Sequence, residues 1–107
     1  MEIINKEKYS ILKPSVDLID DNAKNFILEC EIEIAKHNTE IYVIDFESVK
    51  QVASPVIAFF VSTFCTEKNS YYCINANSSI LDVFRMMQID KCLKIIDSLD
   101  EIKIHKT

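Results

Sequence analysis

The chain has 107 residues, of which 49% are apolar and 27% charged, the size and balance of one ordinary globular domain. It contains no glycine, which excludes the glycine-dependent loops of Walker A and dinucleotide-binding proteins, the Gly-x-Ser-x-Gly elbow of lipases and a standard EF-hand. Its 12 basic and 17 acidic residues give a net charge of −5, and Arg85 is its only arginine, so we do not expect it to bind nucleic acid.

The first third of the chain predicts a hairpin followed by a helix. Residues 3–4 and 9–12 are short apolar segments on either side of four polar residues, the pattern of two antiparallel strands joined by a turn. Apolar residues then recur at helical spacing, and Asp21 or Asn22 precedes them as an N-cap. We therefore expect an N-terminal hairpin and a first helix over residues 23–37.

A central strand and a second helix are expected in the middle of the chain. Residues 41–44 form a continuous β-prone apolar run, typical of a parallel strand that is buried on both faces. After a polar link, Ser54 and Pro55 predict the start of a helix, because serine is a favoured N-cap and proline is favoured just inside it. Residues 56–64 are apolar on most sides, so this helix should be substantially buried.

The last third repeats the alternation of strand and helix. Residues 71–74 predict a strand, Asn77 caps a third helix, and residues 92–96 predict a final strand. The core positions expected in the third helix are Ile80, Val83, Phe84 and Met87. Ser98 and Glu101 have the spacing of a capping box, which predicts a short terminal helix over Ile102 and Ile104. The sequence thus predicts a single α/β domain over residues 1–107, with a mostly parallel mixed sheet, an N-terminal hairpin and about four helices packed on it.

The four cysteines indicate no metal site. They are Cys30, Cys65, Cys73 and Cys92. None of them forms a Cys-x-x-Cys motif, and both histidines, His37 and His105, have polar neighbours. We expect four reduced, buried thiols, with two disulfide bridges as the alternative.

No segment predicts a signal peptide or a membrane span. The first six residues are too polar for a signal sequence. The longest weakly polar run, residues 52–65, is shorter than the roughly 20 apolar residues needed to cross a bilayer. We expect a cytoplasmic protein without direct membrane insertion.

Few residues suggest catalysis. Both histidines lie where helices are expected to end, so a Ser–His nucleophile is not expected. The acidic cluster of Asp17, Asp20 and Asp21 fits a solvated loop better than a site for a hard cation or a phosphoacceptor pocket. Asp45 ends a buried strand, where doubly wound proteins often place functional groups, but it also fits a cap on the following turn.

Ser54 is the more informative position. Its local pattern favours an N-cap hydroxyl that accepts a hydrogen bond from a free amide. A phosphate on this serine would face unpaired amides and the positive end of the helix, so modification is compatible with the fold. It would also add roughly −1.5 to −2 charge, which would repel an acidic partner.

The order of elements and the position of Ser54 make the chain similar to the STAS domain, in particular to bacterial anti-sigma factor antagonists. The densest part of the resemblance covers residues 41–57, where a buried strand leads through a short link to a serine that opens a helix. Residues 71–75 and 80–90 look like the family's later strand and the helix that ends in its Gly-Leu-type turn. Residues 95–101 resemble its final strand and Ser-x-x-Glu helix start, so the resemblance covers essentially the whole length.

This resemblance implies a non-enzymatic switch in transcription regulation, without a cofactor or a metal. Unphosphorylated, the protein would bind an anti-sigma factor and serine-protein kinase of histidine-kinase-like fold, and phosphorylation of Ser54 by that partner would end binding. The family's contact surface corresponds here to Ser54, Pro55, Val56, Asp20, Asp21, Asn22 and Ser48.

The chain departs from the family pattern beside this serine. Ala53 stands where the family has an acidic residue, and Val56 stands in place of its glycine. Pro55 fills the small-residue position between them. Without the glycine, a partner's backbone approaches Ser54 less easily.

Other functions are compatible with this sequence. A STAS-like regulatory subunit of a membrane-transport assembly, as in lipid-transporting ATP-binding-cassette systems, would contact a transporter ATPase instead of an anti-sigma factor. A small enzyme on a flavodoxin-like sheet is a third hypothesis, although no glycine-rich phosphate loop supports it. An aspartyl-phosphate receiver fits poorly, because Lys94 lies inside its expected strand and the chain is short for that class.

Overall fold

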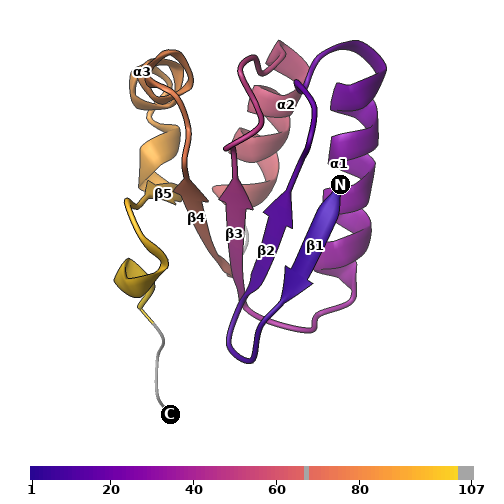
Figure 1. The fold of residues 1–107 in the computed structure, drawn as a ribbon, viewed down its shortest axis with the longest axis vertical. Helices are drawn as coiled ribbons and strands as arrows, with labels where there is room; N and C mark the ends of the chain where they lie inside the picture. Colours follow the sequence, from indigo (N-terminus) through magenta and orange to yellow (C-terminus); the bar gives the residue numbers. More distant parts are fainter. Residues whose placement is uncertain (67, 104–107) are drawn as a thin grey trace.

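Five strands form one mixed sheet in the order β1-β2-β3-β4-β5 (Figure 1). The computed structural model describes residues 1–66 and 68–103. The strands are β1 Glu2–Asn5, β2 Ser10–Lys13, β3 Ile41–Asp45, β4 Ser70–Ile74 and β5 Leu93–Ile95. β1 pairs antiparallel with β2, and every other neighbouring pair is parallel. The predicted N-terminal hairpin and mostly parallel sheet are confirmed.

The described residues form three α-helices and three shorter helical turns. The α-helices are α1 Asp20–Ala35, α2 Ser54–Phe59 and α3 Ser78–Met86. α2 continues directly into the π-helical turn η1 Phe60–Phe64, and the 3-10 turns are η2 Ile89–Lys91 and η3 Leu99–Glu101. Within the described part of the chain, no helix is long and apolar enough to cross a membrane. The prediction of about four helices was wrong by one, because the described part of the terminal segment forms only η3; Ile104, which was expected in the terminal helix, lies outside the described residues.

The capping box predicted before η3 forms, yet the helix does not continue. The Ser98 backbone N–H donates to Glu101 Oε2 at 2.9 Å, and the Ser98 hydroxyl accepts from the Asp100 N–H at 3.3 Å. The backbone is extended again at Ile102. Leu99 and Ile102 are half-buried and pack against the sheet face opposite the α-helices.

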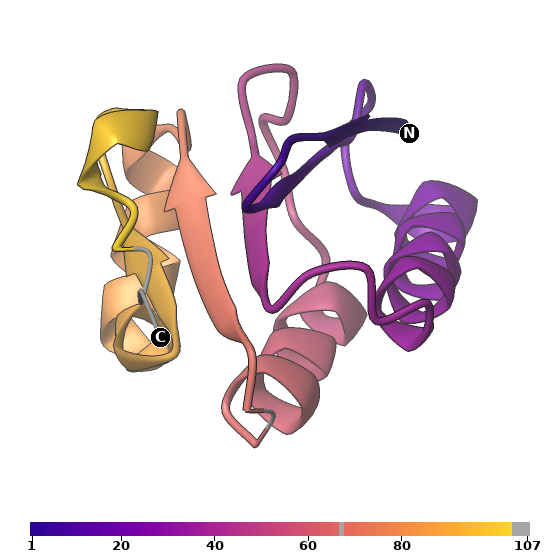
Figure 2. The same ribbon diagram turned by 90° about the horizontal axis from the view of Figure 1, so that it is seen from below.

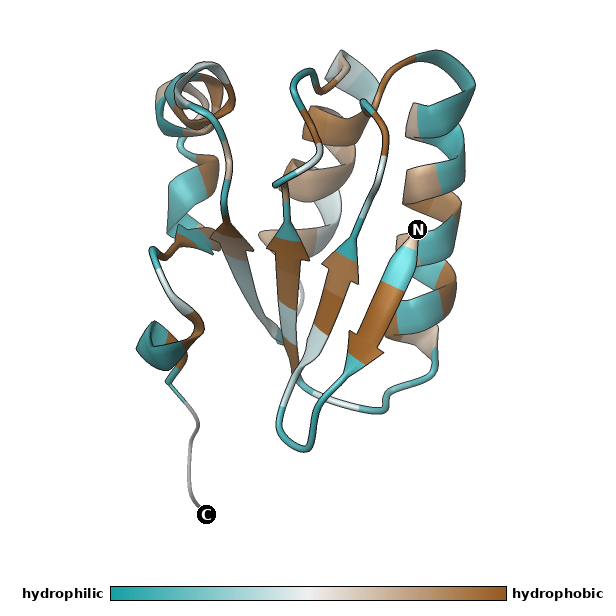
Figure 3. Ribbon diagram, in the orientation of Figure 1, coloured by the Kyte–Doolittle hydropathy of each residue, from teal (hydrophilic) through white to brown (hydrophobic). Residues whose placement is uncertain are grey.

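Side chains of the central strand alternate between two apolar clusters. Tyr42 and Ile44 join the larger cluster under the three helices, whereas Val43 and its neighbour Tyr72 join a smaller cluster on the opposite face. Figure 2 shows the C-terminal turn on the opposite side of the sheet from α2, and Figure 3 shows largely apolar strands beside an α1 that mixes polar and apolar residues. Tyr42, Val43 and Ile44 are at most 1% exposed, which confirms a strand buried on both faces.

Aromatic rings join α2 and η1 to the sheet and to α3. Phe64 stacks on Tyr71 with ring centroids 3.9 Å apart, and Tyr71 stacks in turn on Tyr42. Phe60 meets Phe84 of α3 in an edge-on contact at 5.8 Å. Such pairs contribute about 0.5–1.5 kcal/mol each beyond their burial, so they hold η1 against the sheet and against α3.

The start of α1 differs from its prediction, whereas the start of α3 agrees. Ile19 is the N-cap of α1 and no side chain caps this helix, so neither Asp21 nor Asn22 has the predicted role. Asp21 instead lies in the first turn, where a carboxylate is favourable beside the positive end of the helix. Asn77 caps α3 as predicted, since its Oδ1 accepts from the Ile80 N–H at 2.9 Å.

Four residues other than glycine adopt the left-handed backbone conformation in the described part of the chain. Positive φ angles occur at Asp20 (51°), His37 (53°), Asn75 (63°) and Gln88 (59°). His37 and Gln88 directly follow the C-caps of α1 and α3, a position that glycine usually occupies. A residue with a Cβ in this region costs roughly 1–2 kcal/mol, so the ends of both helices carry backbone strain.

Two of the four cysteines form a disulfide, which corrects the prediction of four reduced thiols. Cys65 follows η1 and Cys92 follows η2, and their Cα atoms lie 5.0 Å apart in the bonded pair. Cys30 and Cys73 are free and buried, as predicted. Helical periodicity placed Cys65 in an apolar stretch but carried no information on what faces it across the fold. His105 lies outside the described residues.

Candidate functional site

Three loops meet at the edge of the sheet where the parallel strands end. Leu18 of the β2–α1 loop forms a parallel bridge with Val52 of the β3–α2 loop. The Leu18 N–H donates to the Gln51 carbonyl at 2.9 Å, and the Ala53 N–H donates to the Leu18 carbonyl at 2.8 Å. These backbone bonds fix the loop that leads into Ser54.

Side chains tie the same loops together around Lys50. Asp17 Oδ1 accepts from the Lys50 N–H at 2.7 Å. Asn77, at the start of α3, donates from Nδ2 to the Lys50 carbonyl at 3.2 Å. The β3–α2 loop is therefore held from both sides, by the loop before α1 and by the cap of α3.

Asp45 caps the turn after β3. Its Oδ1 accepts from the Glu47 N–H at 2.9 Å and from Asn75 Nδ2 at 3.1 Å. Both oxygen contacts are structural, and they agree with the expectation of a turn cap. Among the residues that the structure describes, no group of three or more His, Cys, Asp or Glu could hold a metal ion. Asp17, of the acidic cluster, accepts a hydrogen bond from the Lys50 N–H.

Ser54 is the first residue of α2 and not its N-cap, which corrects the prediction. The N-cap is Ala53, whose backbone is extended because its N–H is bonded to Leu18. The Ala53 carbonyl accepts from the N–H groups of Val56 (3.0 Å) and Ile57 (3.3 Å). Ser54 is exposed, and its hydroxyl forms no hydrogen bond with any described residue.

The two residues after Ser54 differ in accessibility. Pro55 is exposed in the first turn of α2. Val56 is fully buried, so the structure removes it from the candidate contact surface. Val56 also lies in ordinary helical backbone, and this turn needs no glycine.

The remaining predicted contact residues lie at the same edge but not in one pocket with Ser54. Asp20, Asp21 and Asn22 are exposed in the first turn of α1, and Ser48 is exposed in the β3–α2 loop. Asn22 lines a hollow beside α1 that Ser54 does not line. The structure thus places these residues on one edge of the molecule, where only Asn22 and Ser54 line a hollow and each lines a different one.

Ser54 lies at the rim of an apolar groove that the sequence did not predict. Two adjoining hollows between α2 and α3 share Ile57 and Val83. We call them together the α2–α3 groove; its lining residues are Ser54, Ile57, Ala58, Val61, Val83 and Met87 in one part, and Lys50, Gln51, Val52, Ser79, Ile80 and Phe84 in the other. The first part has a volume of about 440 Å³.

Exposure within α3 explains why the groove was missed. Ile80 and Phe84 are buried as predicted, but Val83 is 36% and Met87 is 52% exposed. All four residues share one helical face, so their spacing alone cannot tell the buried pair, Ile80 and Phe84, from the exposed pair. Val83 and Met87 are therefore groove residues and not core residues.

The two free thiols are not poised for chemistry. Burial, and then the nearby charge of Asp45, raises the pKa of Cys73 to about 12. Burial likewise raises the pKa of Cys30 far above its ordinary value. Since the thiolate is the nucleophile, neither group is an activated one.

Comparison with known proteins identifies a shared fold. No protein-family model matches the chain, and no curated protein matches it in sequence. A solved structure, described as the NMR structure of the protein TM1081, superposes with a TM-score of 0.76 over 92% of this chain and 82% of that one. The two sequences are 18% identical. The chain is therefore similar to that protein in its α/β fold.

Proposed function

We propose that this protein is a non-enzymatic, partner-switching regulator with a STAS-like domain, resembling the anti-sigma factor antagonists. In the unphosphorylated state its Ser54 edge binds an anti-sigma factor of histidine-kinase-like fold. Phosphorylation of Ser54 by that partner ends the binding. The observation that carries this proposal is an exposed, unbonded Ser54 hydroxyl at the rim of an apolar groove.

The loop before Ser54 supports the proposal because it forms a fixed platform. The Leu18–Val52 bridge and the contacts of Lys50 with Asp17 and Asn77 hold it in place. Interfaces of preorganised proteins move little on binding, which avoids the entropy cost of ordering a loop. A partner can therefore meet Ser54 and Pro55 without a rearrangement of the edge.

A phosphate on Ser54 would remain largely uncompensated by the helix, contrary to the unpaired amides expected from its predicted position as the N-cap. The N–H groups of Val56 and Ile57 are already bonded to the Ala53 carbonyl, and Pro55 has no N–H. The phosphate would add roughly −1.5 to −2 charge to a chain of net charge −5. Placed beside apolar groove residues, this charge would oppose both an acidic partner and the desolvation that binding requires.

Affinity capture from the source cell with four forms of the protein tests the proposal. The forms are wild type, Ser54→Ala, Ser54→Asp and Ser15→Asp, and captured proteins are identified by mass spectrometry. We expect wild type and Ser54→Ala to enrich a protein with a histidine-kinase-like ATPase domain, and Ser54→Asp to lose it. Ser15 is an exposed serine that lines the separate hollow beside α1, so Ser15→Asp controls for the added charge and should retain the partner.

Three outcomes would contradict the proposal or part of it. Equal binding by Ser54→Ala and Ser54→Asp would remove the switch. A transporter ATPase as the captured partner would favour the membrane-transport alternative. If Ser15→Asp loses the partner to the same degree as Ser54→Asp, overall charge and not the position of Ser54 governs the interaction. Thermal unfolding curves of all four forms should match, which ensures that a folding defect does not cause the loss of binding.

A further inference from the structure

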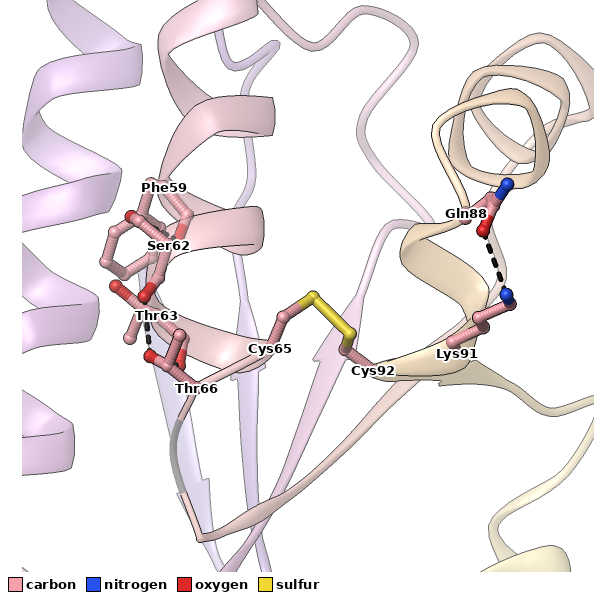
Figure 4. The surroundings of a disulfide bond; sticks show 8 residues. All are labelled: Phe59, Ser62, Thr63, Cys65, Thr66, Gln88, Lys91 and Cys92. Carbon is pink, nitrogen blue, oxygen red and sulfur yellow. Dashed lines mark hydrogen bonds between the residues drawn. A yellow bond between two sulfur atoms is a disulfide. The ribbon is translucent and has the colours of Figure 1, made fainter.

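The Cys65–Cys92 disulfide joins the two walls of the α2–α3 groove beyond one of its ends (Figure 4). Cys65 lies four residues after Val61, which lines the groove from η1. Cys92 follows η2, which is the continuation of the chain after Met87 on the α3 side. The bond therefore links the segment that ends one wall to the segment that follows the other.

The groove is fastened differently at its two ends. At the end near Lys50, the tie is the hydrogen bond from Asn77 Nδ2 to the Lys50 carbonyl. At the other end it is the covalent bond of Cys65 with Cys92. Between them the walls meet at the groove floor, through the edge-on contact of Phe60 with Phe84. Cleavage of the disulfide would leave the floor intact and release one end.

One of the two residues that form the disulfide is exposed to solvent. Cys65 is exposed and Cys92 is half-buried, whereas Cys30 and Cys73 are buried. The buried pair has raised thiol pKa values and so lacks the thiolate needed to attack the bond. Exchange with an external thiol at Cys65 is therefore the accessible route, and reshuffling within the chain is not.

We propose that Cys65–Cys92 is a reversible thiol-exchange site, and that its reduction loosens the α2–α3 groove. A thiolate of a dithiol reductant, of the kind found in thioredoxin-class proteins, attacks Sγ of Cys65 and forms a mixed disulfide, while Sγ of Cys92 leaves as a thiolate and takes up a proton. The second thiol of the reductant then attacks the mixed disulfide and releases Cys65. Two electrons pass to the protein, and the reductant becomes a disulfide.

This inference concerns the shape of the groove and does not depend on a partner or on phosphorylation of Ser54. Its test uses methyl-labelled protein and NMR, with dithiothreitol as reductant and oxidised glutathione as oxidant. We expect reduction to add two hydrogens by mass spectrometry and to shift the methyl signals of Ile57, Val83 and Met87. The signal of Ile11, on the opposite sheet face, should stay in place. Oxidised glutathione should restore the original spectrum.

Two variants complete the test. Cys65→Ser/Cys92→Ser should give the reduced spectrum without dithiothreitol, and Lys91→Ala, an exposed substitution beside Cys92, should keep the oxidised one. Unchanged groove signals on reduction would overturn the proposal, and so would a bond that glutathione fails to re-form. Global unfolding of the reduced wild-type protein, followed by far-UV circular dichroism, would also overturn it, because the disulfide would then be structural. The wild-type titration decides the matter even if the double variant does not fold.

Discussion

Replacing Cys65 and Cys92 together by serine should lower the free energy of unfolding by about 3.5 kcal/mol at 25 °C. The two residues are separated by 27 positions, and the entropy that such a cross-link removes from the unfolded chain is about 12 cal/mol/K for a loop of this length. Typical domains are stable by about 5–15 kcal/mol, so the variant should stay folded with a much smaller margin. For a chain of this size the melting temperature should fall by roughly 15 °C.

The size of this loss in stability depends on whether the disulfide acts mainly on the native state or on the unfolded chain. In the native state Phe60 already contacts Phe84, and Phe64 already stacks on Tyr71. These rings keep the floor of the groove packed without the bridge while the end of the groove loosens, so the fold is retained and most of the loss in the free energy of unfolding should come from greater freedom of the unfolded chain. Urea unfolding of wild type, reduced wild type and the double variant measures it, and the last two should agree.

The control for this prediction is Lys91→Ala. The Lys91 ammonium contacts only Gln88 Oε1 (2.8 Å) among the described residues, and both side chains are exposed. Its removal should change stability by no more than about 0.5 kcal/mol. A loss below about 1 kcal/mol in the double variant would refute the reasoning, because the cross-link would then hardly restrict the unfolded chain.

Four other substitutions test separate parts of the structure. His37→Gly and Gln88→Gly should each stabilise the fold by about 0.5–1 kcal/mol in thermal unfolding, since relief of left-handed strain exceeds the entropy that glycine adds to the unfolded chain; a loss of stability would contradict this. Asp17→Ala should cost about 1 kcal/mol and speed amide hydrogen exchange at Lys50, whose N–H would lose its acceptor; unchanged exchange would show that the tie is not formed in solution. The pKa of Cys73 is raised by burial to about 12 from 9.0, so its folded state holds a proton that the unfolded state loses, and stability should fall by roughly 1.4 kcal/mol per pH unit as pH rises above 9; Cys73→Ala should lack this contribution in urea titrations.

Most of the fold follows from patterns of apolar residues. The run at residues 41–44 predicted a strand buried on both faces, and Val43 and Ile44 are fully buried in β3. Periodicity also located α1 and α3, and the Asn77 cap was read from a local signal that the structure retains. These features depend on residues close together in sequence, and a single sequence carries that information.

The features that escaped prediction depend on contacts between distant segments. Ala53 became the cap of α2 because Leu18, far away in sequence, bonds to its N–H, and the preference of Ser54 for that role did not prevail. Glu33 of α1 is a charged residue of a type that is mostly exposed in proteins, yet it is 3% exposed and pairs with Lys36 at 3.0 Å. The groove and the disulfide likewise arise where α2 and α3 approach across β4. A periodic pattern defines a helical face but not the element that covers it.

The absence of glycine affects both the stability of the chain and the rigidity of the edge that carries Ser54. A chain without glycine loses less entropy on folding at each position, and it accepts strain at helix ends such as Gln88 in return. The edge that carries Ser54 is held by a backbone bridge and by side-chain ties instead of a flexible glycine turn. On such a rigid platform a phosphate would act through its charge, with little change in shape. The disulfide would act through shape, with no change in charge. Phosphorylation of Ser54 and reduction of the disulfide would therefore change the same groove by independent physical means. Each of the two can be tested while the other is held fixed.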